Sequence, residues 1–506
     1  MTDQRYRIYL RARYRFLCGH LGYLVALIGL LLLAPLPLLL VFPEDVPLLG
    51  GFLFPGLGLL LLGALLRACA TVAEDNLLSL AEGSLLVALA WLTAIAAGAV
   101  PFAWAGQDWT RAVFEATSGW TTTGLSVLDV ARTSPLLLFW RSFMQYAGGA
   151  GLAILMLSAM TGPTGIGLST AEGRGEQLVP QVRQSARLVL RLYFGYLLFG
   201  VPALYLAGMD WFDALNHAFC ALSTGGFSTR ADSIAYWNSP AVEAVLMLLM
   251  GLGTLNFLTA YTLLRGDWRA VLGNGEVRVA ALLLPLATAV LFLAGAFRIY
   301  PGLPEYLRIL LFQVVSALST TGFQTIAFSG GEDFGYLVLI LLMLIGGGAN
   351  STAGGIKLHR IYLLFKGLRQ EALAAFRSPR EHCEEGIWIG GRRRFLDESE
   401  IRKAAEYVGL FLFVWLLGSC ALTAFGHSLG DSLFEFASAL GTVGLTAGIT
   451  GPATPAGQLW VQIFGMLFGR LEFFVLFWGL VKLARDLGTA GFPGTGGKFP
   501  RRGRLL

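Results

Sequence analysis

Long apolar runs recur from one end of this chain to the other, and most are near the length that crosses a lipid bilayer, about 20 residues. Charged residues are 14% of the 506 residues and mean hydropathy is +0.65, whereas soluble domains carry about 25% charged residues. The composition therefore indicates one polytopic membrane domain. Five scattered cysteines without a Cys-x-x-Cys pair predict packing thiols, with no disulfide framework and no metal site. The net charge of +5 suggests no nucleic-acid partner.

A short motif occurs four times, each time between apolar runs, as TTGL, TGGF, TTGF and TVGL. One copy alone would be typical of small-residue helix packing, but four copies in register indicate a fourfold internal repeat. The four copies are aligned on their glycines (position 0), which are Gly124, Gly226, Gly322 and Gly444; position −2 is always threonine (Thr122, Thr224, Thr320 and Thr442), and position +1 is a large apolar residue (Leu125, Phe227, Phe323 and Leu445). Position −6 is a small residue (Ser118, Cys220, Ser316 and Ser438), and position −9 is a polar residue (Glu115, His217, Gln313 and Glu435).

Each motif follows a short amphipathic stretch of helical length, which we interpret as a re-entrant half-helix, and lies between two full spans. We interpret the second span of units 1, 2 and 4 as continuous, at about Pro135–Met160, Val242–Leu264 and Leu459–Leu483. Two further spans, near Gly22–Phe42 and Leu53–Ala70, precede the first unit. The first of these is too long for a signal peptide and is expected to be retained.

The predicted fold is an all-α membrane protein of four fused helix–pore-loop–helix units around a pseudo-fourfold pore, with two extra N-terminal transmembrane helices and ten transmembrane helices in all. The predicted division is an N-terminal two-helix domain (1–73), pore units 1, 2 and 3 (74–165, 166–270 and 271–375), a cytoplasmic loop (376–400), pore unit 4 (401–487) and a flexible cytoplasmic tail (488–506).

Lys and Arg gather at both termini and in the connections between units, whereas few lie beside the motifs. An even number of spans puts both termini on one side of the membrane. The positive-inside rule then predicts cytoplasmic termini and connections, with the four loops on the outer side.

Four such loops around an axis would bring carbonyl oxygens together, and ringed carbonyls can replace the water shell of a cation. Glycine permits backbone conformations that a Cβ forbids, and half-helices aimed inward would point negative dipole ends at the ion. The absence of an acidic ring at the motif favours a monovalent cation over calcium. The candidate ion-binding residues, named the filter loops below, are Thr122, Thr123, Gly124, Thr224, Gly225, Gly226, Thr320, Thr321, Gly322, Thr442, Val443 and Gly444.

These four units, with one filter glycine each, resemble the Trk/Ktr/HKT superfamily of potassium transporters, and the two extra N-terminal helices make the chain most similar to the TrkH branch. The resemblance implies gated potassium uptake across the cytoplasmic (inner) membrane, with K⁺ as the transported ion, no organic cofactor and no enzymatic activity. It also implies a homodimer on a cytosolic TrkA-like ring of nucleotide-binding regulators. The chain departs from the pattern at MQYAGGAG in unit 1 and LNFLTAY in unit 2.

The most specific part of the resemblance is LLMLIGGGANSTAGGIKLHR, whose glycine-rich loop acts in the family as a gate below the filter. Here that loop consists of Gly346, Gly347, Gly348, Ala349, Asn350, Ser351, Thr352, Ala353, Gly354 and Gly355. The sequence Gly-Arg-Leu-Glu in the last helix resembles a motif of the family, and by this resemblance Arg470 corresponds to the family's gate-facing arginine. An intramembrane arginine needs a partner, and we expect carbonyls near Gly347 and Ala349, because Glu472 points to another face of the helix.

Several alternatives stay open from the residues alone. The glycine-rich loop could be a packing interruption, or a phosphate-binding loop, although no Gly-Lys-Ser/Thr follows it. Lys357 could mark the cytoplasmic boundary by snorkelling, while His217 and Gln313 are expected to tie pore helices to their neighbours. The whole chain could be a secondary transporter coupled to Na⁺ or H⁺, another monovalent-cation pathway or a membrane enzyme. Four units in one direction favour a pore over the inverted halves typical of transporters.

Overall fold

The protein is described by a computed structural model that covers residues 3–70, 78–151, 182–296, 302–326, 333–374, 376, 386–389, 392–395 and 397–491. The described chain is helical except for one antiparallel hairpin, β1 (Gly386–Ile389) with β2 (Arg392–Phe395). This hairpin is a small departure from the all-α prediction and lies within the predicted cytoplasmic loop. The preceding residues 381–385 lie outside the described residues.

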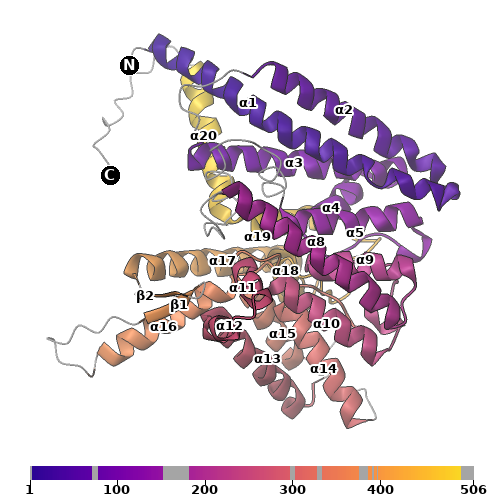
Figure 1. The fold of residues 1–506 in the computed structure, drawn as a ribbon, viewed down its shortest axis with the longest axis vertical. Helices are drawn as coiled ribbons and strands as arrows, with labels where there is room; N and C mark the ends of the chain where they lie inside the picture. Colours follow the sequence, from indigo (N-terminus) through magenta and orange to yellow (C-terminus); the bar gives the residue numbers. More distant parts are fainter. Residues whose placement is uncertain are drawn as a thin grey trace.

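The N-terminal part is a pair of long helices that lie side by side along one edge of the molecule (Figure 1). It comprises α1 (Asp3–Leu33), two 3-10 helices (Leu36–Leu40 and Pro43–Leu48) and α2 (Leu49–Ala68). Arg13 of α1 forms a buried ion pair with Glu82, at 2.7 Å, and so attaches this pair to the first pore unit. The helix that contains the start of the predicted first span begins earlier than Gly22, because the basic N-terminal sequence already forms turns of α1.

Each pore unit begins with a long helix and continues with a short one. The pairs of long and short helices are α3 (Leu80–Trp104) with α4 (Trp109–Trp120), α8 (Val182–Leu206) with α9 (Trp211–Leu222), α13 (Gly275–Ala294) with α14 (Leu303–Leu318), and α17 (Glu398–Ala424) with α18 (Leu429–Gly441). Side chains cap three of the short helices, because Asp108, Asp210 and Ser428 each accept a hydrogen bond from a backbone amide in the first turn. The short helices are the predicted half-helices.

After each filter loop comes the second helix of the unit, and in units 2, 3 and 4 it is interrupted. The pieces are α5 (Pro135–Ala150) in unit 1; α10 (Pro240–Thr254) and α11 (Phe257–Leu264) in unit 2; α15 (Asp333–Ile345) and α16 (Leu358–Ala374) in unit 3; and α19 (Ala456–Leu471) and α20 (Phe473–Gly491) in unit 4, while α12 (Trp268–Gly273) connects units 2 and 3.

The predicted continuous spans Val242–Leu264 and Leu459–Leu483 were wrong. The axes of α10 and α11 differ by 115°, and those of α19 and α20 by 98°. The causes are local: Asn256 caps a new helix with its side chain, and Glu472 has a φ of +55°, which no α-helix accommodates. Interrupted backbone at membrane depth is stable only inside protein or beside water. The predicted Pro135–Met160 span ends as a helix at Ala150, and its last residues lie outside the described part.

Six helices among the described residues are long and apolar enough to cross a membrane, or up to eight if each of two bent pairs counts as one span. This is fewer than the ten predicted. The remaining second helices, α5 and α15, have only 16 and 13 residues in the described part. In addition, α20 continues to Gly491 and so includes the first residues of the predicted flexible tail, whereas residues 492–506 lie outside the described part.

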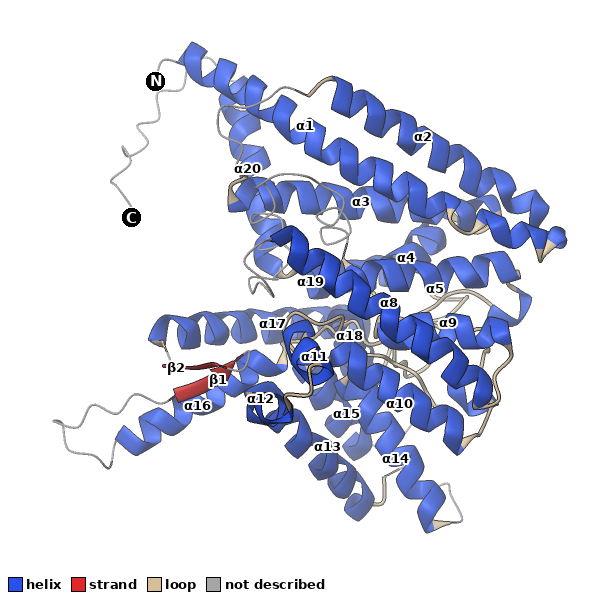
Figure 2. Cartoon of the chain, viewed as in Figure 1, coloured by secondary structure: helices blue, strands red, loops and turns tan. Residues whose placement is uncertain are grey.

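The four units follow one another in a closed order. The second helix of each unit packs on the short helix of the next: α5 on α9, α10 on α14, α15 on α18, and α19 on α4. The last contact brings unit 4 back to unit 1, and α20 also packs along α3. Most residues of the short helices and filter loops are buried, and α18 lies in the middle of the helical body in Figure 2. This packing encloses the filter loops within a ring of helices.

Candidate ion filter and glycine-rich loop

All four filter loops have the same backbone conformation. The threonines at position −2 have φ between 51° and 56°, and the glycines have φ between 73° and 98°. In each loop the amide between them donates to the carbonyl five residues back, at 2.8–2.9 Å. The alignment of the four copies therefore holds at the backbone. Glycine was expected to adopt a left-handed conformation, whereas the left-handed threonines were not foreseen.

The four filter glycines contact the neighbouring filter loops in the same closed order as the helices. A Cβ on any of them would overlap a carbonyl oxygen of the next loop. Because the overlapping atom belongs to the backbone, it cannot move aside as a flexible side chain could, and only glycine fits at these positions. The overlaps would be Gly124 with Gly225, Gly226 with Thr321, Gly322 with Val443, and Gly444 with Thr123. The structure thus brings all four predicted loops together, with their Thr and Val side chains fully buried.

The polar residue at position −9 fastens each short helix to its own loop. Glu115 accepts from the Ser126 hydroxyl at 3.0 Å, His217 contacts the Ser228 hydroxyl at 2.9 Å, Gln313 donates to Thr325 at 3.0 Å, and Glu435 accepts from Thr446 at 2.9 Å. His217 and Gln313 were expected to tie pore helices to their neighbours; the hydrogen bonds above instead tie each short helix to the loop of its own unit. The sequence analysis missed these hydroxyl partners. They could have been predicted from position +2 of the repeat, where three units have a hydroxyl residue: Ser126, Ser228 and Thr446.

A cavity of about 130 Å³ is lined by all four filter glycines and by residues that follow them in the chain, among them Ser126 and Ser228. Arg141 also lines this cavity and forms a buried ion pair with Glu115 at 2.6 Å. Its guanidinium also lies 4.0 Å from the ring centre of Phe227, in the filter region of unit 2. The charge is therefore compensated by a carboxylate and held against the neighbouring unit, so the cavity leads to uncharged backbone at the glycines.

On the other side of the filter, the glycine-rich loop lies directly against the threonine column. Thr352 contacts the Thr224 hydroxyl at 3.2 Å, and the Gly354 amide donates to the Thr320 hydroxyl at 2.8 Å. A Cβ on Gly354 would also overlap the Thr442 hydroxyl. The loop thus contacts three of the four units at their position −2 threonines. A packing interruption alone would not require a chain segment in this place.

Charged side chains from outside the glycine-rich loop, Arg470 and Glu276 among them, hold it in place. Arg470 donates to the carbonyl of Thr352 at 2.7 Å and to the carbonyl of Gly148 in unit 1 at 2.6 Å. Glu276, at the start of α13, accepts from the amide of Ala349 at 2.8 Å. The loop acceptor of Arg470 is therefore Thr352 and not the expected carbonyls near Gly347 and Ala349. The role of Glu276 was missed, because it lies in a connection that the sequence marks only as basic.

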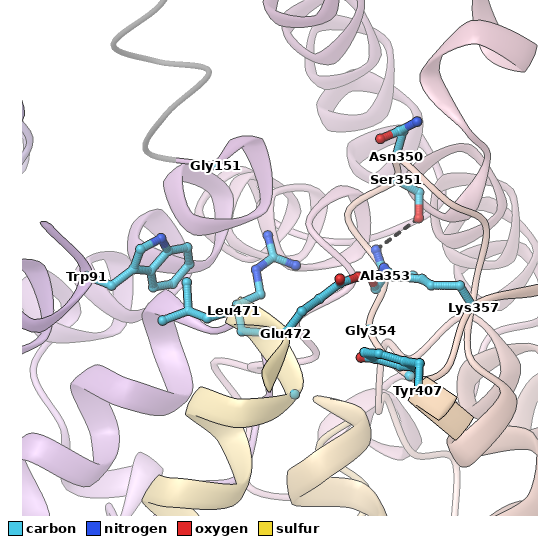
Figure 3. A pocket seen from close by; sticks show the side chains of 13 residues that line it. Trp91, Gly151, Asn350, Ser351, Ala353, Gly354, Lys357, Tyr407, Leu471 and Glu472 are labelled. Carbon is cyan, nitrogen blue, oxygen red and sulfur yellow. Dashed lines mark hydrogen bonds between the residues drawn. The ribbon is translucent and has the colours of Figure 1, made fainter. Parts of the chain in front are cut away.

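A cavity of about 50 Å³ lies beside the glycine-rich loop, between residues Asn350 to Gly354 on one side and Trp91 and Leu471 on the other (Figure 3). The side chain of Lys357 reaches into this region and donates to the carbonyl of Ala353. Its amine is thus bound to the loop, which differs from the predicted snorkelling to the membrane boundary. Glu472 pairs with Arg360 at 2.8 Å, in agreement with the expectation that it does not serve Arg470.

Comparisons with known proteins agree with this architecture. A profile of the TrkH family, described as a cation transport protein, matches residues 60–296 and 301–482. An uncharacterised cation transporter of Methanocaldococcus jannaschii is 30% identical over 462 residues, covering 89% of this chain and 92% of that protein. The Trk system potassium uptake protein TrkH of Escherichia coli K12 is 31% identical over 425 residues, covering 80% and 86%.

The crystal structure of the potassium transporter TrkH from Vibrio parahaemolyticus resembles this fold with a TM-score of 0.79 at 27% identity, covering 93% of this chain and 98% of that one. The two ranges matched by the family profile together contain all four filter loops, the glycine-rich loop and Arg470. The chain belongs to the TrkH family of cation transport proteins.

Proposed function

We propose that this protein takes up potassium ions across the cytoplasmic membrane along a path formed by the four filter loops. The observation that carries the proposal is the closed cycle in which each filter glycine lies against a carbonyl oxygen of the next loop. Closely approaching backbones that carry no side chain can surround a cation with neutral oxygens. The similarity to potassium transporters of the TrkH family supports potassium as the ion.

The pore in this proposal is pseudo-fourfold and is made by ten spans. Six single helices and two bent pairs supply eight of them, and α5 and α15 begin the other two. Both termini and the basic connections lie in the cytoplasm, as charge placement favours. The cavity lined by the filter glycines then lies on the outer side and collects ions from outside, and the filter loops strip their water.

The glycine-rich loop in this proposal is the gate. Its contacts with Thr224, Thr320 and Thr442 support a closed position in the ion path. Its ten residues include five glycines, so rearrangement costs little local strain. Arg470 stabilises the closed loop through Thr352 and adds a positive charge that opposes a passing cation.

The active assembly in this proposal is a homodimer that binds a cytosolic TrkA-like ring of nucleotide-binding subunits. The basic connections between units supply a surface for it, and movement of α12 and the start of α13 would reach the gate through Glu276 and Ala349. The relatives named above are transporters, which supports a transported ion as the only ligand and no enzymatic step.

Uptake into liposomes tests the proposal. Purified protein is reconstituted with and without its candidate regulator, and initial rates of potassium uptake are measured with a potassium gradient alone and then with an added inward sodium gradient or proton gradient. Uptake driven by the potassium gradient alone, and competed only weakly by sodium, supports the proposal. Uptake that requires a sodium or proton gradient would instead identify a coupled secondary transporter.

A further inference from the structure

One polar side chain reaches a filter loop from a different unit. Gln145 lies on α5 of unit 1 and is completely buried. Its amide nitrogen donates to the carbonyl oxygen of Gly225 at 2.6 Å, and its amide oxygen accepts from the backbone amide of Phe227 at 3.1 Å. Gln145 therefore contacts the backbone on both sides of Gly226, the filter glycine of unit 2.

The position of Gln145 explains the irregular member of the repeat. Between the threonine and the glycine of the filter loops, the other three units have Thr123, Thr321 and Val443, whereas unit 2 has Gly225. A Cβ on Gly225 would overlap the carboxamide carbon of Gln145. The side chain of unit 1 thus fills the space that a side chain of unit 2 would otherwise occupy.

The positions equivalent to Gln145 in units 2 and 4 carry an apolar residue. Gly148, Gly253 and Gly469 correspond to one another, because a Cβ on each would overlap a carbonyl at the end of the short helix of its own unit. Three residues before them lie Gln145, Met250 and Met466, all fully buried. Methionine and glutamine are similar in length, so packing alone would accept methionine at position 145.

We propose that Gln145 is a specificity-determining residue that positions the carbonyl of Gly225 and the amide of Phe227, and thereby sets the shape of the filter in unit 2. The inference rests on the proposed function of the filter loops. The Gly225 carbonyl is also the one that lies against Gly124 of unit 1, so Gln145 fixes the contact between two loops. A carbonyl oxygen that is held in this way cannot move closer to the smaller sodium ion. The filter would therefore coordinate potassium better than sodium.

The test is the substitution Gln145→Met, which installs the residue that units 2 and 4 use. We expect the ratio of potassium to sodium uptake in liposomes to fall about five- to tenfold, because two buried backbone groups lose their partner. The matched control is Gln458→Met, which changes a fully buried glutamine of α19 that bonds Ile449 and His427 outside the filter loops. The control should keep the wild-type ratio. An unchanged ratio in a folded Gln145→Met protein overturns the inference.

A pair of substitutions separates positioning from general stability. Gly225→Thr alone should abolish selective uptake, since its side chain has no room beside Gln145. Gly225→Thr combined with Gln145→Ala vacates that room and should restore part of the ion preference, a gain that stability alone does not produce. Failure of the pair to recover more preference than Gly225→Thr alone contradicts the inference. Gly226→Ala, measured in parallel, tests the filter itself: if it too leaves the ratio unchanged, the proposed function fails and not only the role of Gln145.

Discussion

Arg470 in the last pore unit donates to the carbonyl oxygen of Thr352 in the third, at 2.7 Å, and the same guanidinium reaches Gly148 in the first at 2.6 Å. One side chain therefore connects three units directly beneath the filter loops. An unpaired arginine near the bilayer centre costs at least about 2.5 kcal/mol on insertion scales. The carbonyl of Thr352 contributes to satisfying that charge only while the glycine-rich loop keeps its observed position.

Replacing Arg470 with alanine should increase potassium flux and leave the ion preference unchanged. The substitution removes both the bond that holds the loop and the positive charge near the path, whereas the filter loops stay intact. Initial rates in liposomes at matched protein content measure the effect, with gel filtration to verify folding. Equal or slower flux in a folded variant would leave Arg470 with a structural role alone.

Replacing Glu276 with alanine should also increase flux, because the amide of Ala349 loses an anionic acceptor worth about 1.5–3 kcal/mol. Glu276→Gln keeps an acceptor oxygen at the same place and should stay closer to the wild-type rate. The pair of variants is compared in the presence and absence of the candidate regulator. If both variants behave alike, the hydrogen bond to Ala349 does not hold the loop.

Shortening the glycine-rich loop should raise flux and weaken regulation. Deletion of residues 349–352 removes the contacts to Thr224, Glu276 and Arg470 together. The deletion variant is reconstituted and assayed with and without regulator, after its oligomeric state has been verified. Wild-type flux with intact regulation in a folded deletion variant would contradict the gate.

Breaking the Arg141–Glu115 ion pair should destabilise the protein strongly. Both side chains are at most 2% exposed, so Arg141→Met leaves a buried carboxylate uncompensated, at a cost of about 3–5 kcal/mol. Arg132→Met is the control, because Arg132 is 89% exposed and pairs loosely with Asp129 at 3.5 Å; such a pair contributes at most about 1 kcal/mol. Thermal unfolding in detergent compares the two variants. Similar melting temperatures would show that the buried pair is not needed for stability.

The filter loops could be predicted from the sequence because backbone conformation and close approach both select glycine, and four aligned copies make that selection visible. The interruptions of the second helices could not, because a broken span has the same apolar composition as a continuous one, and Asn256 and Glu472 reveal nothing until their surroundings are known. Glu276 and Gln145 were missed for a related reason. Their partners lie 73 and 80 residues away along the chain, and only the closed packing of the units brings them together.

The most direct measurement is the ratio of potassium to sodium uptake in liposomes for the wild-type protein and for Gly124→Ser. A Cβ on Gly124 would overlap the carbonyl of Gly225, and a φ of +98° is unfavourable for serine. We predict that the wild type prefers potassium and that the variant loses most of that preference while still folding as the same oligomer. A wild-type protein without preference, or a folded Gly124→Ser variant with the wild-type ratio, would contradict the assignment of the four loops as the ion filter.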